Sequence, residues 1–592
     1  MKSSAVVMLV SSVLVSLCVV RPGPAGAGSA EELMKLSEEY WELHLRTNPV
    51  NATTIGDHRY DHLLADISPE GTARVAADLE DLLRRVEVID ESDLSPNDVI
   101  THTALHFQIR SGLARIACDL DSWTVDPLRG PQVNLFNIQS VQKLTDAESG
   151  KAMLARWRAM EPYLDQHTAN IRHGLGDGKV AVRYAVEKVI SEIDELEATP
   201  VEEWALLEPV ENLPESWSVS RGDEFKTEMT TIVSETVRPA LLRYRDVLKT
   251  EVLPKARSQE TPGIMHLAGG EECYRNMILL HTSLELSPSK IHRIGMEEVE
   301  RLNGEMRVLG KKVLGIDNLE EIHHRLREDP AMHFTTRDEV AEKAEEALRR
   351  AEAVMADWFG VVPKAPCQVV RMEAHEEKHS TIAYYKRPAA DGSRPGSYYI
   401  NTYAPETRPR YEAEALAFHE AVPGHHLQIA IMQELSDIPE FRKYSGVTAF
   451  VEGWALYTER LSNEMGLYTS DTDLFGMLSY DSWRACRLVV DTGMHALGWS
   501  RQQAIDFMIA NSVLAKNNIT NEVDRYITWP GQALAYKLGQ REIFRLRDEA
   551  KARLDDRFDI KEFHDAVLGQ GAVDLQTLGT IVEKWIESRP AE

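Results

Sequence analysis

The sequence predicts a mainly helical protein with a small β-sheet beside one helix that is rich in histidine and glutamate. Between residues 30 and 256, and again from 441 to the end, apolar residues recur at three-to-four spacing with acids between them, which is typical of amphipathic helices. Three short runs, at 368–372, 382–385 and 397–401, resemble strands instead. With 592 residues the chain can bury a large core, and we expect two lobes.

Residues 1–27 have the pattern of a signal peptide. Lys2 gives a basic start, an apolar stretch follows, and Ala25-Gly26-Ala27 is a small-residue cleavage site. The apolar stretch is too short for a confident membrane anchor. We therefore expect cleavage near Ala27 and an exported protein, periplasmic or secreted. Cys18 follows a bulky leucine, which is a poor lipidation signal, so a lipoprotein is the less favoured alternative.

Two lobes are predicted after this segment, at 28–285 and 286–592. The pattern of the first lobe predicts amphipathic helices separated by prolines. The glycine-rich stretch 174–178 lacks the strand and the spacing of a nucleotide-binding motif, so we expect a plain loop. In the second lobe Ser287-Pro288 begins a helix, and further helical runs end near Trp358, just before the strand-like runs.

Charge and cysteine content exclude several classes of protein. The net charge is −28, which argues against nucleic acid as a partner and against stable association with an anionic membrane. The four cysteines beyond the signal peptide are scattered and form no C-x-x-C, so they indicate neither a metal site nor a disulfide framework. Their pairing stays open, as does the oligomeric state. They are Cys118, Cys273, Cys367 and Cys486.

The stretch 408–428, RPRYEAEALAFHEAVPGHHLQ, contains the strongest candidate site. In the H-E-x-x-H motif of zinc hydrolases, two histidines on one helix face bind the metal and the glutamate takes a proton from its water. Here His419-Glu420 is followed by Pro423-Gly424 and then by a histidine pair, 425–426. Proline and glycine interrupt helical hydrogen bonding, so we expect a kink or bulge that brings the pair back towards His419.

A second stretch, His375 to His379, reads HEEKH and matches the formal motif more closely. It lies between two strand-like runs, and its variable positions are Glu and Lys. A metal-binding helix must bury its ligand face, so we interpret this stretch as a solvated charged turn.

Two histidines leave a catalytic zinc one protein ligand short. The apolar helix 450–461 supplies a candidate, Glu452, which would be costly to bury unless it is paired or metal-bound. The alternative is an ordinary ion-paired glutamate. Glu459 lies seven residues on, on the same face, where it could accept the second ring N–H of a ligand histidine.

The blocks HEAVPGHHLQ, EGWALYTE and PGQALAYKLG resemble the signature of the DUF885 family, which is bacterial and often exported. That family is similar to zinc peptidases of the thimet-oligopeptidase type, and the resemblance covers most of residues 30–585. It implies a two-lobed helical shell around a deep channel with one zinc ion at its floor. It also implies His419, His425 and Glu452 as ligands and Glu420 as the base. On an unbroken helix His426 would share the face of His419, whereas the Pro-Gly step favours His425.

Further along the chain, Arg525, Tyr526 and Tyr536 fall where such peptidases carry groups that position substrate or stabilise the transition state. A tyrosine packed in the core is the alternative for Tyr536. A polar helical face upstream indicates either a channel wall or a buried ion-pair network. It comprises Arg484, Arg487, Asp491 and His495.

The function predicted from these residues is that of an exported zinc metallopeptidase that cleaves short peptides. Glu420 would take the water's proton and pass it to the leaving amine. One alternative is a zinc amidohydrolase acting on non-peptide amides or cell-wall fragments. Another is a non-catalytic zinc-binding protein, against which the intact glutamate argues. No G-x-S-x-G elbow supports serine chemistry.

Overall fold

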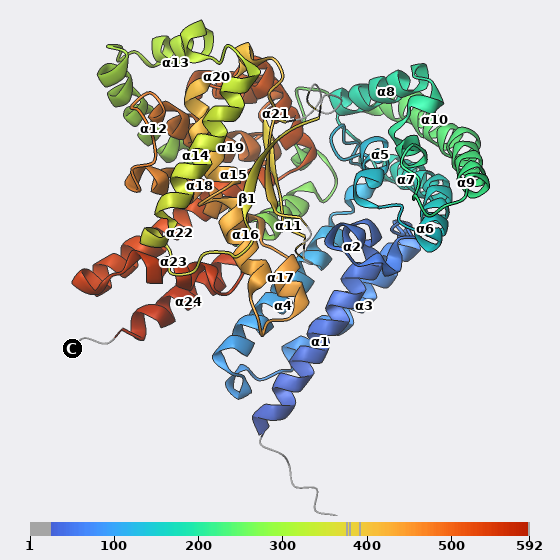
Figure 1. The fold of residues 1–592 in the computed structure, drawn as a ribbon, viewed down its shortest axis with the longest axis horizontal. Coiled ribbons are helices and arrows are strands. Elements are labelled where there is room, and N and C mark those ends of the chain that lie inside the picture. The colour runs from blue at the N-terminus through green and yellow to red at the C-terminus, as the bar shows by residue number, and fades with distance from the viewer. Residues whose placement is uncertain (1–24, 374–376, 378–380, 390–391, 393, 590–592) are drawn as a thin grey trace, which may run out of the picture.

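The computed structural model describes residues 25–373, 377, 381–389, 392 and 394–589. It is mainly helical with one small sheet, which confirms the predicted fold class (Figure 1). The N-terminal residues 1–24, which hold most of the predicted signal peptide, lie outside the described part. The predicted helix after Ser287 and the helical run ending at Trp358 are both present.

The N-terminal helices begin the chain order. They are α1 (Ala25–Thr47), α2 (Pro49–Ile55), α3 (Pro69–Glu87), α4 (Pro96–Ala117), α5 (Pro131–Val141), α6 (Ala147–Arg158), α7 (Met160–Gly176), α8 (Arg183–Ala198), α9 (Val219–Ile232) and α10 (Arg238–Val247). Several start with proline after a serine cap: the Ser68 and Ser95 side chains each accept a backbone N–H of the first turn. Helices α5 to α10 enclose their own apolar core around Trp157, Val189 and Met229.

The next helices lead to the sheet and then to the C-terminus. They are α11 (Gly270–Thr282), α12 (Pro288–Val313), α13 (Leu319–Glu328), α14 (Arg337–Trp358), α15 (Ala413–Glu420), α16 (His425–Glu434), α17 (Glu440–Tyr444), α18 (Thr448–Glu464), α19 (Leu474–Ala496), α20 (Arg501–Asn511), α21 (Lys516–Thr528), α22 (Ala535–Leu554), α23 (Ile560–Leu568) and α24 (Leu575–Glu587). Helix α19 runs through the interior and is buried along almost its whole length.

The sheet has three strands, β1 (Cys367–Arg371), β2 (Ala383–Lys386) and β3 (Gly396–Ile400). Its order is β1-β3-β2, with β1 parallel and β2 antiparallel to β3. Each strand lies within one residue of its predicted run. Strand β2 packs beside α15, so the sheet borders the helix that carries His419 (Figure 1).

Contacts between residues far apart in the sequence tie the chain together, and two of them involve α11 and α17. A disulfide between Cys118 and Cys273, whose pairing the sequence left open, ties the end of α4 to α11. The ring of Phe441, on α17, packs edge-on against Tyr40 of α1, with 5.7 Å between ring centroids. The division into lobes at 28–285 and 286–592 stays a prediction.

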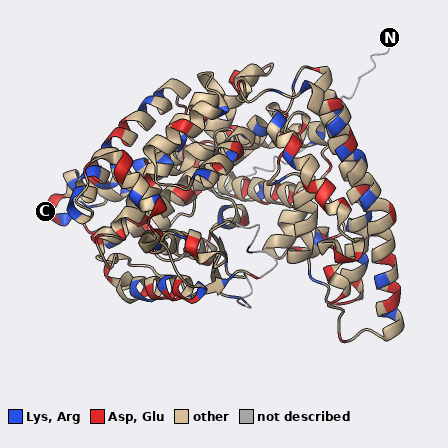
Figure 2. Cartoon of the chain, turned by 90° about the horizontal axis from the view of Figure 1, so that it is seen from above, with Lys and Arg blue, Asp and Glu red and all other residues tan. Residues whose placement is uncertain are grey.

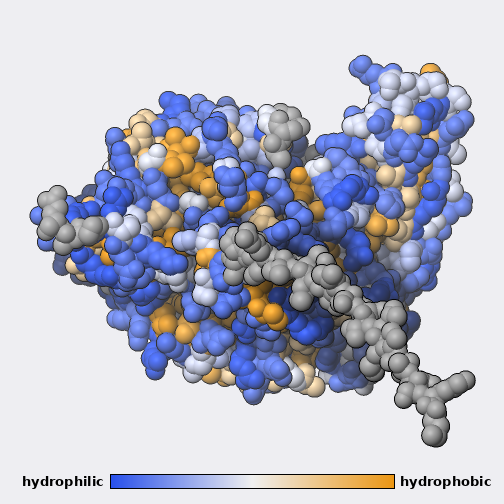
Figure 3. All heavy atoms as spheres, turned by 90° about the horizontal axis from the view of Figure 1, so that it is seen from below, coloured by the Kyte–Doolittle hydropathy of each residue, from blue (hydrophilic) through white to orange (hydrophobic). Residues whose placement is uncertain are grey.

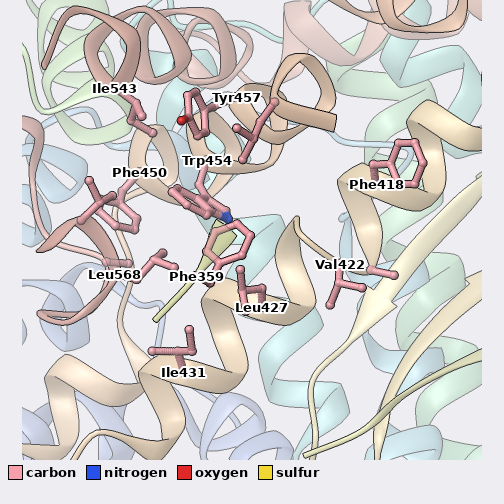
Figure 4. Close-up of a cluster of buried hydrophobic side chains, with 14 of the residues drawn as sticks. Phe359, Phe418, Val422, Leu427, Ile431, Phe450, Trp454, Tyr457, Ile543 and Leu568 are labelled. Atoms are coloured by element: carbon pink, nitrogen blue, oxygen red, sulfur yellow. The ribbon is translucent and has the colours of Figure 1, made fainter. Parts of the chain in front are cut away.

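The largest apolar cluster lies under the histidine-bearing helices (Figure 4). Trp454 is its centre: the ring is fully buried, and Nε1 donates a hydrogen bond to the carbonyl of Pro423 at 2.9 Å. Helices α18 and α22 approach closely beside this cluster. A Cβ atom on Gly453 would lie 2.5 Å from Cα of Gly539, so the two backbones touch.

Charged residues of both signs alternate along the outer helices (Figure 2). The face in Figure 3 is mostly hydrophilic, with hydrophobic residues in separate small groups. Among the described residues, no helix has the length and apolar character needed to cross a bilayer.

Candidate metal centre

The helix predicted over 408–428 is interrupted rather than merely kinked. Helix α15 ends at Glu420, α16 begins at His425, and a turn with a cis Val422–Pro423 peptide separates them. A Cβ atom on Gly424 would collide with the carbonyl oxygen of His419, so glycine is required where the turn folds back. This return brings the start of α16 next to the end of α15.

His419, His425 and Glu452 form a compact cluster of possible metal ligands. Oε2 of Glu452 lies 3.8 Å from Nε2 of His419 and 3.5 Å from Nε2 of His425. One ligand atom from each of the three lies within 4.8 Å of the others. Bonds of about 2.1 Å in tetrahedral geometry place ligand atoms about 3.4 Å apart. The cluster therefore fits a small divalent cation.

Glu459 supports this cluster from α18. Nδ1 of His419 lies 2.8 Å from Oε1 of Glu459, and both side chains are buried. With Nδ1–H donating to this carboxylate, Nε2 of His419 carries the lone pair that faces Glu452. Nδ1 of His425 is buried and has no hydrogen-bond partner in the part of the chain that the structure describes.

His426 points elsewhere. Its Nδ1 lies 2.9 Å from the Tyr385 hydroxyl and its Nε2 3.0 Å from the carbonyl of Ala365. Burial lowers its pKa to about 4, so it is a neutral side chain that connects α16 to β2. The structure thus brings His425, and not His426, to His419 and Glu452. Nothing in the sequence singles out Tyr385 as its partner.

The electrostatics keep the cluster ready for a cation. Burial, together with the neighbouring His425, lowers the pKa of His419 well below its ordinary value. Burial also acts to lower the pKa of His425, but the hydrogen bond and the charge of Glu452 outweigh it and raise the pKa. Burial acts to raise the pKa of Glu452, and His425 reverses this to a net lowering. An ionised Glu452 beside two imidazoles is a suitable donor set for zinc.

Glu420 adjoins the cluster at the end of α15. Burial raises the pKa of its carboxyl, with His425 lowering it and Glu452 raising it again. Solvent reaches the neighbouring groups, because the side chains of His425 and Glu452 remain 11% and 20% exposed. A carboxylate whose basicity is increased by burial, next to a solvent-accessible cluster, can accept a proton from water.

Arg487, on α19, belongs to a buried polar network. It donates from Nε to the Tyr526 hydroxyl at 2.8 Å and pairs with Glu522 at 2.7 Å. Two other members of the predicted polar face are also engaged: Asp491 accepts from the Tyr274 hydroxyl at 2.5 Å, and His495 Nε2 lies 2.9 Å from the Tyr526 carbonyl. Of these three buried residues, only Arg487 forms an ion pair among the described residues, and Asp491 and His495 are held by hydrogen bonds.

Tyr536 and Arg525 lie beside this network. The ring of Tyr536, in the first turn of α22, faces the Arg487 guanidinium at 4.5 Å, and its hydroxyl has no hydrogen bond to any described residue. Arg525 donates to Gln532 at 3.1 Å and stacks over Trp529 at 4.8 Å. Tyr526 is fully engaged by its neighbours, whereas the Tyr536 hydroxyl is available to a ligand.

The HEEKH stretch is described at one position. Its histidines, 375 and 379, lie outside the described residues, so the structure places neither. Glu377, between them, is buried and paired with Arg337. The carbonyl of Glu377 accepts a hydrogen bond from Asn401 at 2.6 Å, so at this one described position the stretch is buried and not solvated as predicted.

The family model described as "Bacterial protein of unknown function (DUF885)" matches residues 49–582. A solved structure titled "putative lipoprotein" from Colwellia psychrerythraea is 27% identical, with a TM-score of 0.87 over 95% of this chain and 99% of that one. A second, a "putative lipoprotein of unknown function" from Shewanella oneidensis, is 20% identical with a TM-score of 0.72 over 94% and 99%, and shares the fold. The sequence matches no curated protein. Because the family model spans most of its length, the chain belongs to the DUF885 family.

Proposed function

We propose that this protein is a zinc metallopeptidase that hydrolyses short peptides. One observation carries the proposal: two imidazole Nε2 atoms and a carboxylate converge within 4.8 Å, with Glu420 directly after the first histidine. His419, His425 and Glu452 would hold a single zinc ion. When bound, zinc lowers the pKa of a coordinated water and polarises a substrate carbonyl.

The chain's own residues would do the remaining work. Glu420 accepts the proton of the attacking water and delivers it to the amide nitrogen as the C–N bond breaks. The Tyr536 hydroxyl donates a hydrogen bond to the carbonyl oxygen of the substrate, where negative charge develops. Glu459 keeps the His419 ring in the orientation that presents Nε2. A deep channel between two lobes would admit an extended peptide and exclude folded proteins.

Digestion of a synthetic peptide library by the zinc-loaded protein, with metal content measured on the same sample, tests the proposal. We expect about one zinc per chain and cleavage of short peptides in preference to folded proteins. Hydrolysis of non-peptide amides alone would indicate an amidohydrolase. Zinc binding with no hydrolysis would indicate a metal-binding protein.

We also propose that the chain is exported. The small-residue site near Ala27 supports removal of the N-terminal segment, and the names of the two similar structures support lipid attachment at Cys18 as the alternative. Mass spectrometry of the mature N-terminus distinguishes the two. A free terminus near Gly28 supports a soluble exported form, whereas an acylated Cys18 supports a lipoprotein.

A further inference from the structure

Arg484 is a buried cation without a counter-ion in the described part of the chain. The side chain is on α19 and the residue is 4% exposed. Its Nε and Nη1 atoms are buried and have no hydrogen-bond partner, and no carboxylate of the described residues lies within ion-pair distance. Arg487, one turn further along, uses two of its three nitrogens on Tyr526 and Glu522. A buried charge normally has such partners, because desolvation without them is costly.

Aromatic rings hold the Arg484 guanidinium in place. It lies over Trp483 at 4.1 Å and over Tyr480 at 4.6 Å, and the ring of Tyr536, on α22, is 5.7 Å away. The Tyr480 hydroxyl is also buried and also lacks a hydrogen-bond partner among the residues that the structure describes. The rings contact the cation faces but do not satisfy its in-plane N–H groups. Unused donors from two adjacent side chains therefore remain in one small region.

This region adjoins the metal cluster. Helix α19, which carries Arg484, packs against α15, which carries His419 and Glu420, and against α18, which carries Glu452. The nearby carboxyl of Glu412 does not serve as the counter-ion of Arg484. It accepts a hydrogen bond from Ser479 at 2.6 Å, and burial raises its pKa to about 7.

We propose that Arg484 binds a carboxylate of the substrate, and that this is the C-terminal carboxylate of a short peptide. The inference rests on the proposed peptidase function and specifies its substrate. A planar guanidinium with free N–H groups matches a carboxylate in a bidentate pair. In a chain of net charge −28, an anionic ligand needs such a local cation to bind. An anchored C-terminus fixes which peptide bond reaches the metal cluster, so cleavage occurs close to the C-terminal end.

The first test compares trialanine with its C-terminal amide as substrates of the zinc-loaded protein. Wild type should prefer the free acid by about 10- to 100-fold in kcat/KM, the range for a hydrogen bond to a charged group. Arg484→Met should lower the free-acid value to that of the amide and leave the amide value nearly unchanged. Arg484→Lys should recover part of the preference, because it keeps the charge but not the planar fork.

Arg442→Met is the matched control. Arg442 is also 4% exposed, but it lies on α17 and is bonded to Thr101 and to the carbonyl of Gln570. Its loss should reduce stability and leave the free-acid preference intact.

A comparison of Ala-Ala-Glu amide with Ala-Ala-Gln amide tests whether Arg484 binds an acidic side chain instead of the C-terminal carboxylate. A preference for the Glu peptide that disappears in Arg484→Met would assign Arg484 to an acidic side chain and overturn the C-terminal assignment.

Calorimetric binding of trialanine to the metal-free protein gives a readout independent of turnover. Arg484→Met should weaken this binding by about 10- to 100-fold. If the variant loses thermal stability while binding and preference persist, Arg484 is structural and the inference is wrong. If wild type cleaves acid and amide equally well, the inference fails and the peptidase function stands. If trialanine binds through Arg484 but is never cleaved, carboxylate binding stands and the proposed function fails.

Discussion

Nδ1 of His419 and Oε1 of Glu459 lie 2.8 Å apart across the packed surfaces of α15 and α18. Glu459 is fully buried, so this contact replaces the water that would otherwise solvate the ring nitrogen. Glu459→Ala should therefore weaken zinc affinity by about 10- to 100-fold, as measured by chelator competition. Glu459→Gln keeps an acceptor oxygen, so its loss of zinc affinity should be smaller. Equal affinity in all three proteins would contradict the orienting role.

Metal content should depend on His419 and not on His426. His419→Ala removes one of the clustered nitrogens, so we expect the purified variant to lose its approximately one zinc per chain, measured by plasma mass spectrometry. His426→Ala breaks contacts to Tyr385 and Ala365 and should keep the metal. The double variant His375→Ala, His379→Ala should keep it as well. Loss of zinc from that double variant would place the metal in the HEEKH stretch.

Glu420→Gln should preserve zinc content and thermal stability but reduce kcat about 10²- to 10⁴-fold, because an amide cannot accept the proton. Single-turnover kinetics on a cleaved library peptide measure this directly. A rate within about tenfold of wild type would show that Glu420 is not the base.

Tyr536→Phe removes a hydroxyl that has no partner among the described residues, so packing against Arg487 should survive. We expect kcat to fall about 10²- to 10³-fold with KM and zinc content nearly unchanged, as for other single oxyanion donors. If kcat is unchanged and the melting temperature drops, Tyr536 is a core residue. The donor would then be sought at Arg525, because the Tyr526 hydroxyl is already engaged by Trp483 and Arg487.

Stability should decline with acid through buried histidines such as His564. Its Nδ1–H donates to the Trp358 carbonyl and its Nε2 accepts from the Tyr457 hydroxyl, both at 2.8 Å. Burial lowers its pKa to about 3, against 6.5 when unfolded. Between these values the unfolded chain binds the extra proton, so this contribution is complete above pH 6.5 and is lost as pH falls towards 3. The slope is about 1.4 kcal/mol per pH unit.

Urea denaturation from pH 7 to pH 4.5 checks this slope. His564→Asn should reduce the pH dependence of the unfolding free energy by about 1.4 kcal/mol per pH unit, the slope for one proton, whatever its effect on absolute stability. His62→Asn, at an exposed position, is the control. Identical slopes in wild type and His564→Asn would show that His564 is charged in the folded state.

Local rules predicted much of the fold. The three strands were predicted from their alternation and one helix start from Ser287 followed by proline, because both signals come from neighbouring residues. The interruption at 421–424 could only be anticipated as a kink. Its course depends on contacts from distant elements, such as the Trp454 hydrogen bond to Pro423. For the same reason the sequence left the choice between His425 and His426 open.

The environment of Arg484 could not be predicted from the sequence, for a second reason. Four polar residues on one helical face look alike in a periodic pattern. Arg487 is distinguished by Glu522 and Tyr526, which lie 35 and 39 positions away and come from another helix. That no described residue pairs with Arg484 is a property of the packed structure, and no local sequence signal indicates it.

The contact between Gly453 and Gly539 sets a limit on how this site can be altered. Glu452 precedes the first glycine and Tyr536 lies three residues before the second, so their separation is set by touching backbones rather than by side-chain packing. Side-chain rotamers cannot change how closely the two backbones approach, and even alanine at either glycine would force the helices apart. Substitutions that alter the site without moving these helices are therefore to be sought outside this contact, for example in β2, which borders α15.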